Sequence, residues 1–113
     1  MIQQELRKNQ RFDLRLQIEL VRTGNEPLGR VTETRNVSSG GVLFASESQL
    51  PLGQPLEYFI TLLSGKEARE VRIHCIGTVI RLESRSGRLT KEREKPFDVA
   101  ATLERYEFVR NGR

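Results

Sequence analysis

The chain lacks tryptophan and contains one cysteine and one histidine. The shortage of cysteine and histidine argues against an internal disulfide and a zinc site. Cys75 is the only cysteine and His74 the only histidine among the 113 residues. A single cysteine cannot form an internal disulfide, and two such residues cannot supply the ligand set of a zinc site. The G-x-x-x-x-G-K pattern of a phosphate-binding loop is also missing. We therefore expect no metal ion, no cofactor and no enzymatic activity, and we interpret Cys75 as a buried, inert thiol.

Long hydrophobic runs are also missing. No apolar stretch approaches the ~18 residues of a membrane-spanning helix, and residues 1–5 lack the apolar core of a signal peptide. We therefore expect a cytoplasmic protein without membrane insertion. Hydrophobic residues make up 36% and charged residues 30% of the chain, as in soluble globular domains. A chain of 113 residues has room for one domain with one core.

The charge of the chain is modestly positive. Nineteen basic and 15 acidic residues give a net charge of +4, and the isoelectric point is about 9.7. The basic residues are dispersed, whereas strong nucleic-acid binders gather Lys and Arg on one face. The charge therefore favours an anionic ligand without indicating nucleic acid.

Alternation of apolar and polar residues predicts six short β-strands. It is clearest over 13–22, where every second residue from Leu14 to Leu20 is apolar. Segments rich in Gly, Pro, Asn and Ser separate this strand from further strands predicted at 30–34, 42–45, 56–63, 71–82 and 97–103. The spacing predicts one hairpin from the first two strands and a second, longer hairpin from 56–63 and 71–82.

Six strands with turns at nearly regular intervals predict an all-β antiparallel barrel or sandwich, and closure into a barrel would remove exposed edges. The closing segment 104–110 has Tyr106 and Val109 three residues apart, which predicts a short C-terminal helix. We interpret residues 1–12 as a flexible N-terminal arm and 13–113 as the barrel domain.

Two arginines stand four residues apart directly before the first predicted strand. On a helix, Arg7 and Arg11 would share one face, and the position of Arg11 tethers the pair to the barrel. Fork-shaped guanidinium groups match phosphate oxygens and the O6/N7 edge of guanine. A solvated basic tail is the alternative interpretation of this pair taken alone.

A second polar group follows the second predicted strand and consists of Asn36, Ser38, Ser39, Gly40 and Gly41. One amide and two hydroxyls offer hydrogen-bond donors and acceptors. We expect the two glycines to adopt positive φ and to let a ligand approach the backbone. Ser38 could then donate to a phosphate oxygen while Asn36 contacts a base edge. An ordinary turn is the alternative.

Together, an Arg-x-x-x-Arg element before the first strand and an Asn-x-Ser-x-x-Gly turn after the second resemble the PilZ domain, a bacterial receptor family for cyclic di-GMP. The resemblance continues through 42–44, 52–53, 77–81 and 99–103. It implies a six-stranded antiparallel β-barrel with a trailing helix, in agreement with the strand count. It also implies that Arg7 and Arg11 grip guanine edges and phosphates from the arm, while Asn36, Ser38 and Gly41 line the other side of the ligand.

Two positions depart from the family's pattern. Many members carry Asp where this chain has Asn36, and an amide accepts through one oxygen only, which implies a weaker base contact. Many members have a further Arg where this chain has Leu6, and its absence favours one cyclic di-GMP per chain over a stacked pair. The implied mechanism is a switch, in which the ligand orders the arm against the barrel and a downstream protein partner senses the change.

Two other functions stay open. Small β-barrels also bind nucleic acids by base stacking, but most of the five Phe and two Tyr residues fall in apolar strand contexts that favour core packing. Nucleic acid is therefore not the expected partner. The domain could also be a ligand-independent interaction module, as in some members of the family, although the retention of Arg7, Arg11 and Ser38 counts against this.

Overall fold

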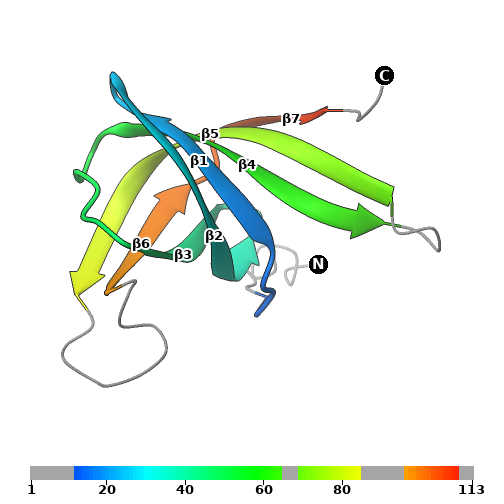
Figure 1. Cartoon of the computed structure of the whole chain (residues 1–113), viewed down its shortest axis with the longest axis horizontal. Helices are drawn as coiled ribbons and strands as arrows, with labels where there is room; N and C mark the ends of the chain where they lie inside the picture. The colour runs from blue at the N-terminus through cyan, green and yellow to red at the C-terminus, as the bar shows by residue number, and fades with distance from the viewer. Residues whose placement is uncertain (1–11, 65–68, 85–95, 110–113) are drawn as a thin grey trace, which may run out of the picture.

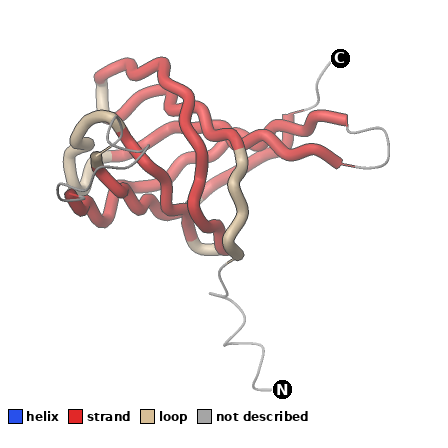
Figure 2. The backbone as a smooth tube through the Cα atoms, turned by 60° about the horizontal axis from the view of Figure 1, so that its bottom comes forward, coloured by secondary structure: helices blue, strands red, loops and turns tan. Residues whose placement is uncertain are grey.

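The computed structural model describes residues 12–64, 69–84 and 96–109, which form an antiparallel β-barrel (Figure 1). These residues form strands, turns and loops but no helix (Figure 2), and so no helix that could cross a membrane. The strands are β1 Gln17–Thr23, β2 Glu26–Ser38, β3 Gly41–Ser46, β4 Pro55–Ser64, β5 Arg69–Ser84, β6 Phe97–Thr102 and β7 Arg105–Val109.

Six of the strands close the barrel. They are hydrogen-bonded in the order β4, β1, β2, β3, β6 and β5, and a further β4–β5 pairing joins the two ends. The 16-residue strand β5 makes this closure possible, because its first part pairs with β4 and its last part with β6. Figure 1 shows β5 bending strongly between these two parts. The six-stranded antiparallel barrel predicted from the sequence is confirmed.

The seventh strand lies outside the closed barrel, along the β4–β5 hairpin that extends from it (Figure 1). β7 pairs with residues 72–76 of β5, so the helix predicted over 104–110 is wrong for the described part of this segment. β6 and β7 follow each other along β5, and the Glu104 N–H donates to the Ile76 carbonyl between them at 2.9 Å. This non-local pairing outweighs a helical spacing too short to specify a helix.

Among the strand boundaries that differ from the prediction, two affect the site. β1 begins at Gln17 instead of residue 13, because the segment before it is held on β2 by the buried Thr34 hydroxyl. That hydroxyl donates to the Leu14 carbonyl at 2.6 Å and accepts from the Leu16 N–H at 2.9 Å. β2 in turn continues to Ser38, so the predicted turn over 36–41 shrinks to two residues between β2 and β3.

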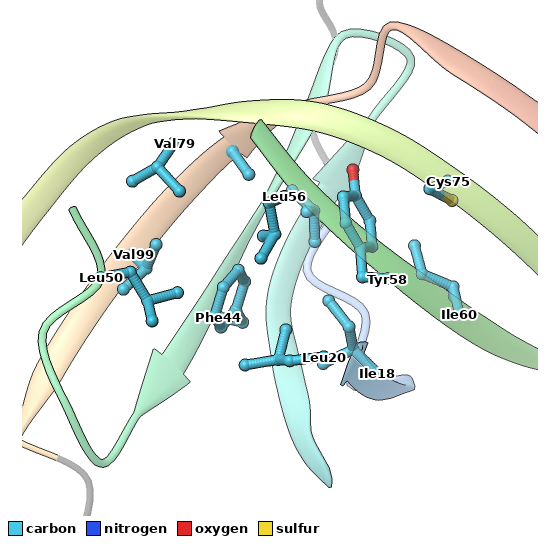
Figure 3. Packing of buried hydrophobic residues seen from close by; sticks show 12 residues of the cluster. Ile18, Leu20, Phe44, Leu50, Leu56, Tyr58, Ile60, Cys75, Val79 and Val99 are labelled. Atoms are coloured by element: carbon cyan, nitrogen blue, oxygen red, sulfur yellow. The ribbon is translucent and has the colours of Figure 1, made fainter. Parts of the chain in front are cut away.

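The core fills the barrel with the inward-facing residues of its strands (Figure 3). Its most completely buried large side chains include Ile18, Leu20, Phe44, Leu56, Tyr58, Val79 and Val99. The Tyr58 hydroxyl donates to the Thr102 carbonyl at 2.9 Å, and burial raises the pKa of this tyrosine far above its ordinary value.

Cys75 is buried as predicted, with 1% of its surface exposed. Burial raises the pKa of its thiol to about 12, so the reactive thiolate is scarce at neutral pH.

The aromatic residues differ in their burial. Phe44 and Tyr58 pack in the core, whereas Phe12, Tyr106 and Phe108 are at least half exposed. The expectation that the aromatic residues mostly serve the core therefore holds for only part of them.

Candidate ligand-binding site

The outer surface of the barrel is hollowed where β2, β3, β6 and β5 lie side by side, and we call this hollow the trough. Its volume is about 220 Å³. The residues that line it are Asn36, Ser38, Gly40, Gly41, Val42, Leu43, Ile80, Arg81, Ala100 and Ala101. The trough therefore contains most of the polar turn that the sequence singled out.

One row of paired residues crosses the trough from rim to rim. Asn36 pairs with Leu43, Leu43 with Ala100, and Ala100 with Arg81. Cross-strand partners project from the same face of a sheet, so the four side chains form a continuous line. The ends of this row are polar, and its middle, formed by Leu43 and Ala100, is apolar. Three strand spacings separate Asn36 from Arg81, or about 14 Å.

A β-bulge in β2 turns Asn36 toward the trough. The ladder between β2 and β3 shifts between Thr34 and Asn36, which leaves Arg35 as the extra residue. Thr34 is fully buried. In a regular strand the residue two positions later would face the interior as well. The extra residue reverses this alternation, so Asn36 faces outward beside Leu43.

A second bulge, in β5, turns Arg81 outward at the opposite rim of the trough. The β5–β6 ladder shifts between Val79 and Arg81, with Ile80 as the extra residue. Val79 is fully buried, whereas Ile80 is 58% exposed and Arg81 is exposed. Without this bulge Arg81 would share the inward orientation of Val79. Both rims of the trough therefore depend on an interruption in a strand.

The end of the trough is a tight turn between Ser38 and Gly41, which pair with each other. The Ser38 Oγ accepts the Gly40 N–H at 3.2 Å. A Cβ on Gly41 would lie 2.5 Å from the Ala101 carbonyl oxygen, so Gly41 permits β3 to lie close to β6. The positive φ predicted for Gly40 and Gly41 is wrong, since Gly41 belongs to extended β3 and the described glycines with positive φ are Gly24, Gly29 and Gly53.

A comparison with protein families identifies the family of the chain. The family model described as PilZ domain matches residues 5–105. The chain belongs to the PilZ domain family. The matched span contains the whole trough and also both arginines of the Arg-x-x-x-Arg element. PilZ domains are a cyclic di-GMP-binding family and generally act as binding modules instead of enzymes. A search of the curated proteins gave no match.

The structure brings part of the predicted PilZ site together. Asn36, Ser38, Gly40 and Gly41 line the trough. Ser39 is exposed in the turn beside them. Arg7 and Arg11 lie outside the described residues, so their predicted contribution stays a prediction.

The start of the described chain lies beside the trough. The Phe12 N–H donates to the Val37 carbonyl at 2.8 Å, and the Val37 N–H donates to the Phe12 carbonyl at 2.9 Å. Val37 stands between Asn36 and Ser38 in the sequence. The residue bonded to Arg11 is therefore anchored on the same strand segment as the polar rim of the trough.

Sequence reasoning missed the far rim and the floor, which are formed by Ile80, Arg81, Leu43 and Ala100. The segments that contain them were interpreted as strands and as part of the family resemblance, but not as part of a site. One signal was present. Arg81 stands two residues after Val79, so simple alternation would bury its charge, and a charged residue at a buried strand position is typical of a bulge.

Proposed function

We propose that this PilZ domain is a cytoplasmic receptor that binds one cyclic di-GMP in the trough, beneath the N-terminal arginines. The trough is the observation that carries the proposal. Its floor of Leu43 and Ala100 offers an apolar surface to a planar guanine, and Asn36 and Ser38 stand at its edge with hydrogen-bonding groups. Such a combination suits a ligand that has both flat bases and anionic phosphates.

Each polar group has a role that fits its chemistry. The Asn36 amide can accept from the guanine N1–H or N2–H₂ groups, or donate to the O6/N7 edge. The Ser38 hydroxyl can donate to a phosphate oxygen. Arg81, on the opposite rim, can bind a phosphate or a second base edge with its two-pronged guanidinium. None of these roles requires a nucleophile or a base, in keeping with recognition without turnover.

The anchoring of Phe12 supports a switch. Arg11 and Arg7 precede an anchored residue, so a ligand in the trough lies within the reach of the arm that carries them. Binding would bridge the arm and the barrel, and a downstream protein partner would recognise the ordered arm. Ordering the arm consumes part of the contact free energy, so a partner that favours the same arrangement would bind cooperatively.

Titration calorimetry of the protein with cyclic di-GMP tests the function directly. We expect micromolar or tighter binding, a stoichiometry near one ligand per chain, and no comparable heat with GTP. The absence of heat, together with no competition against a labelled ligand at high concentration, would rule out the receptor function. A stoichiometry near two would retain the receptor and contradict the single-ligand arrangement.

Arg81 provides a test of the trough that does not depend on the sequence motifs. We expect Arg81→Ala to weaken cyclic di-GMP binding about tenfold, because a bidentate arginine contact contributes about 1–3 kcal/mol. Arg22→Ala is the matched control, since Arg22 is a half-exposed arginine of β1 that pairs with Glu57 and does not line the trough. Equal affinities of the two variants in calorimetry would show that the far rim does not contact the ligand.

A further inference from the structure

The extra residue of the β2 bulge makes a long-range ion pair. The Arg35 Nε donates to the Asp98 Oδ1 at 3.2 Å. The two side chains are 19% and 20% exposed, so this pair is more shielded from water than the other Arg–carboxylate pairs among the described residues. Shielding makes an ion pair stronger and makes the loss of one partner more costly.

The ion pair spans a whole strand. Arg35 belongs to β2 and Asp98 to β6, and β3 lies between them. Asp98 pairs with Ala45 of β3, whose methyl group leaves room for a long side chain above it. The guanidinium therefore connects the two strands that flank β3, directly next to the row that runs from Asn36 to Arg81.

The ion pair involves the bulge residue directly before Asn36, so it can influence the direction in which Asn36 points. The β2–β3 register skips the bulge residue, so the contacts of its side chain help to set its conformation. Arg35 is held on the outer face by Asp98, and Asn36 follows it directly. If the bulge relaxed into a regular strand, Asn36 would turn toward the core.

We propose that the Arg35–Asp98 ion pair is a positioning device, which fixes the β2 bulge and thereby holds the Asn36 amide in the trough. Arg35 and Asp98 are positioning residues, and they act on the ligand through Asn36. The inference rests on the proposed function for its effect on cyclic di-GMP, but its structural part concerns the ligand-free protein.

The direction of the change in cyclic di-GMP affinity distinguishes a positioning role from a general effect of charge. Cyclic di-GMP is an anion, so removing a nearby carboxylate should strengthen its binding if only long-range electrostatics mattered. Positioning predicts the opposite for Asp98→Asn. Replacement of Arg35 would weaken binding under both explanations and therefore does not discriminate between them. Asp98 is the informative residue.

Calorimetry with cyclic di-GMP tests the positioning role on wild type, Asp98→Asn, Asn36→Ala and the double variant. We expect Asp98→Asn to weaken binding about tenfold in the wild-type background and to have little further effect once Asn36 is alanine, because coupled residues are not additive. Glu33→Gln is the matched control, since it neutralises an exposed β2 carboxylate that pairs with Arg15. Unchanged or tighter binding by Asp98→Asn, or the same loss in both backgrounds, would overturn the proposal.

A measurement without ligand keeps this inference separate from the receptor function. In the ligand-free protein, we expect Asp98→Asn to shift the NMR signals of the Asn36 side-chain amide and to speed amide exchange over 34–38, while the β4–β5 hairpin stays unchanged. An unaltered Asn36 signal would refute the positioning role. If wild type failed to bind cyclic di-GMP, the receptor function would be wrong and this ligand-free result alone would decide the inference.

Discussion

Replacing both Arg7 and Arg11 by alanine is expected to abolish cyclic di-GMP binding in practice. Among the described residues that line the trough, Arg81 is the one cation, and the Asn36–Ser38 rim is neutral. The proposed function therefore assigns most of the charge that neutralises two phosphates to the arm. Each bidentate arginine contributes about 1–3 kcal/mol, so each single variant should bind about ten- to a hundredfold more weakly. Calorimetry and competition with a labelled ligand measure both effects.

The control for this pair removes the same charge elsewhere. Arg15→Ala/Arg22→Ala changes two exposed arginines that pair with Glu33 and Glu57 outside the trough. Exposed ion pairs contribute little stability, so this variant should fold and should bind nearly as tightly as wild type. If the two double variants lost affinity equally, only net charge would matter, and the specific role of the arm would be wrong.

The barrel could be predicted because each strand carries its own signal. Alternation in β1 and the apolar runs of β4, β5 and β6 depend on local sequence, and the buried faces follow the period of two. The segment that became β7 has only a short signal of this kind, since Tyr106 and Phe108 alternate with Arg105 and Glu107 within five residues. Its conformation is set by pairing with residues 72–76, about thirty residues earlier in the chain. Sequence analysis did not include this pairing and predicted a helix from the spacing of Tyr106 and Val109.

The candidate site was predictable on one rim only. Asn36 and Ser38 share a short motif, which sequence reasoning can recognise. Arg81 lines the same trough from β5, which two strands separate from β2, and its outward orientation depends on a bulge. A bulge can be located only when the register of both paired strands is known. The outward direction of Asn36 has the same origin. The sequence identifies Asn36 as a candidate, but the register of the β2–β3 ladder determines that this residue faces the trough.

The largest expected loss of stability comes from Gly77→Ala. Gly77 is a buried residue of β5 opposite Leu56, where β5 bends and the end of β6 crosses it. A Cβ there would lie 1.7 Å from the Thr102 carbonyl oxygen and 2.6 Å from its carbon. Both atoms are backbone, so no rotamer change relieves the clash. We expect a loss of about 3 kcal/mol or more in the free energy of unfolding, measured by urea denaturation.

Gly29→Ala separates crowding from backbone strain. Gly29 has φ 59° and no atom within 4 Å of an added Cβ, so alanine there meets only the left-handed conformational cost. That cost is about 1–2 kcal/mol. Equal losses of unfolding free energy for the two variants would mean that β5 and β6 can move apart at little cost in free energy. The two strands should not part freely, because the Thr102 carbonyl also accepts the buried Tyr58 hydroxyl. The preceding β6 residue, Ala101, lines the trough, so we expect Gly77→Ala to weaken cyclic di-GMP binding as well as stability.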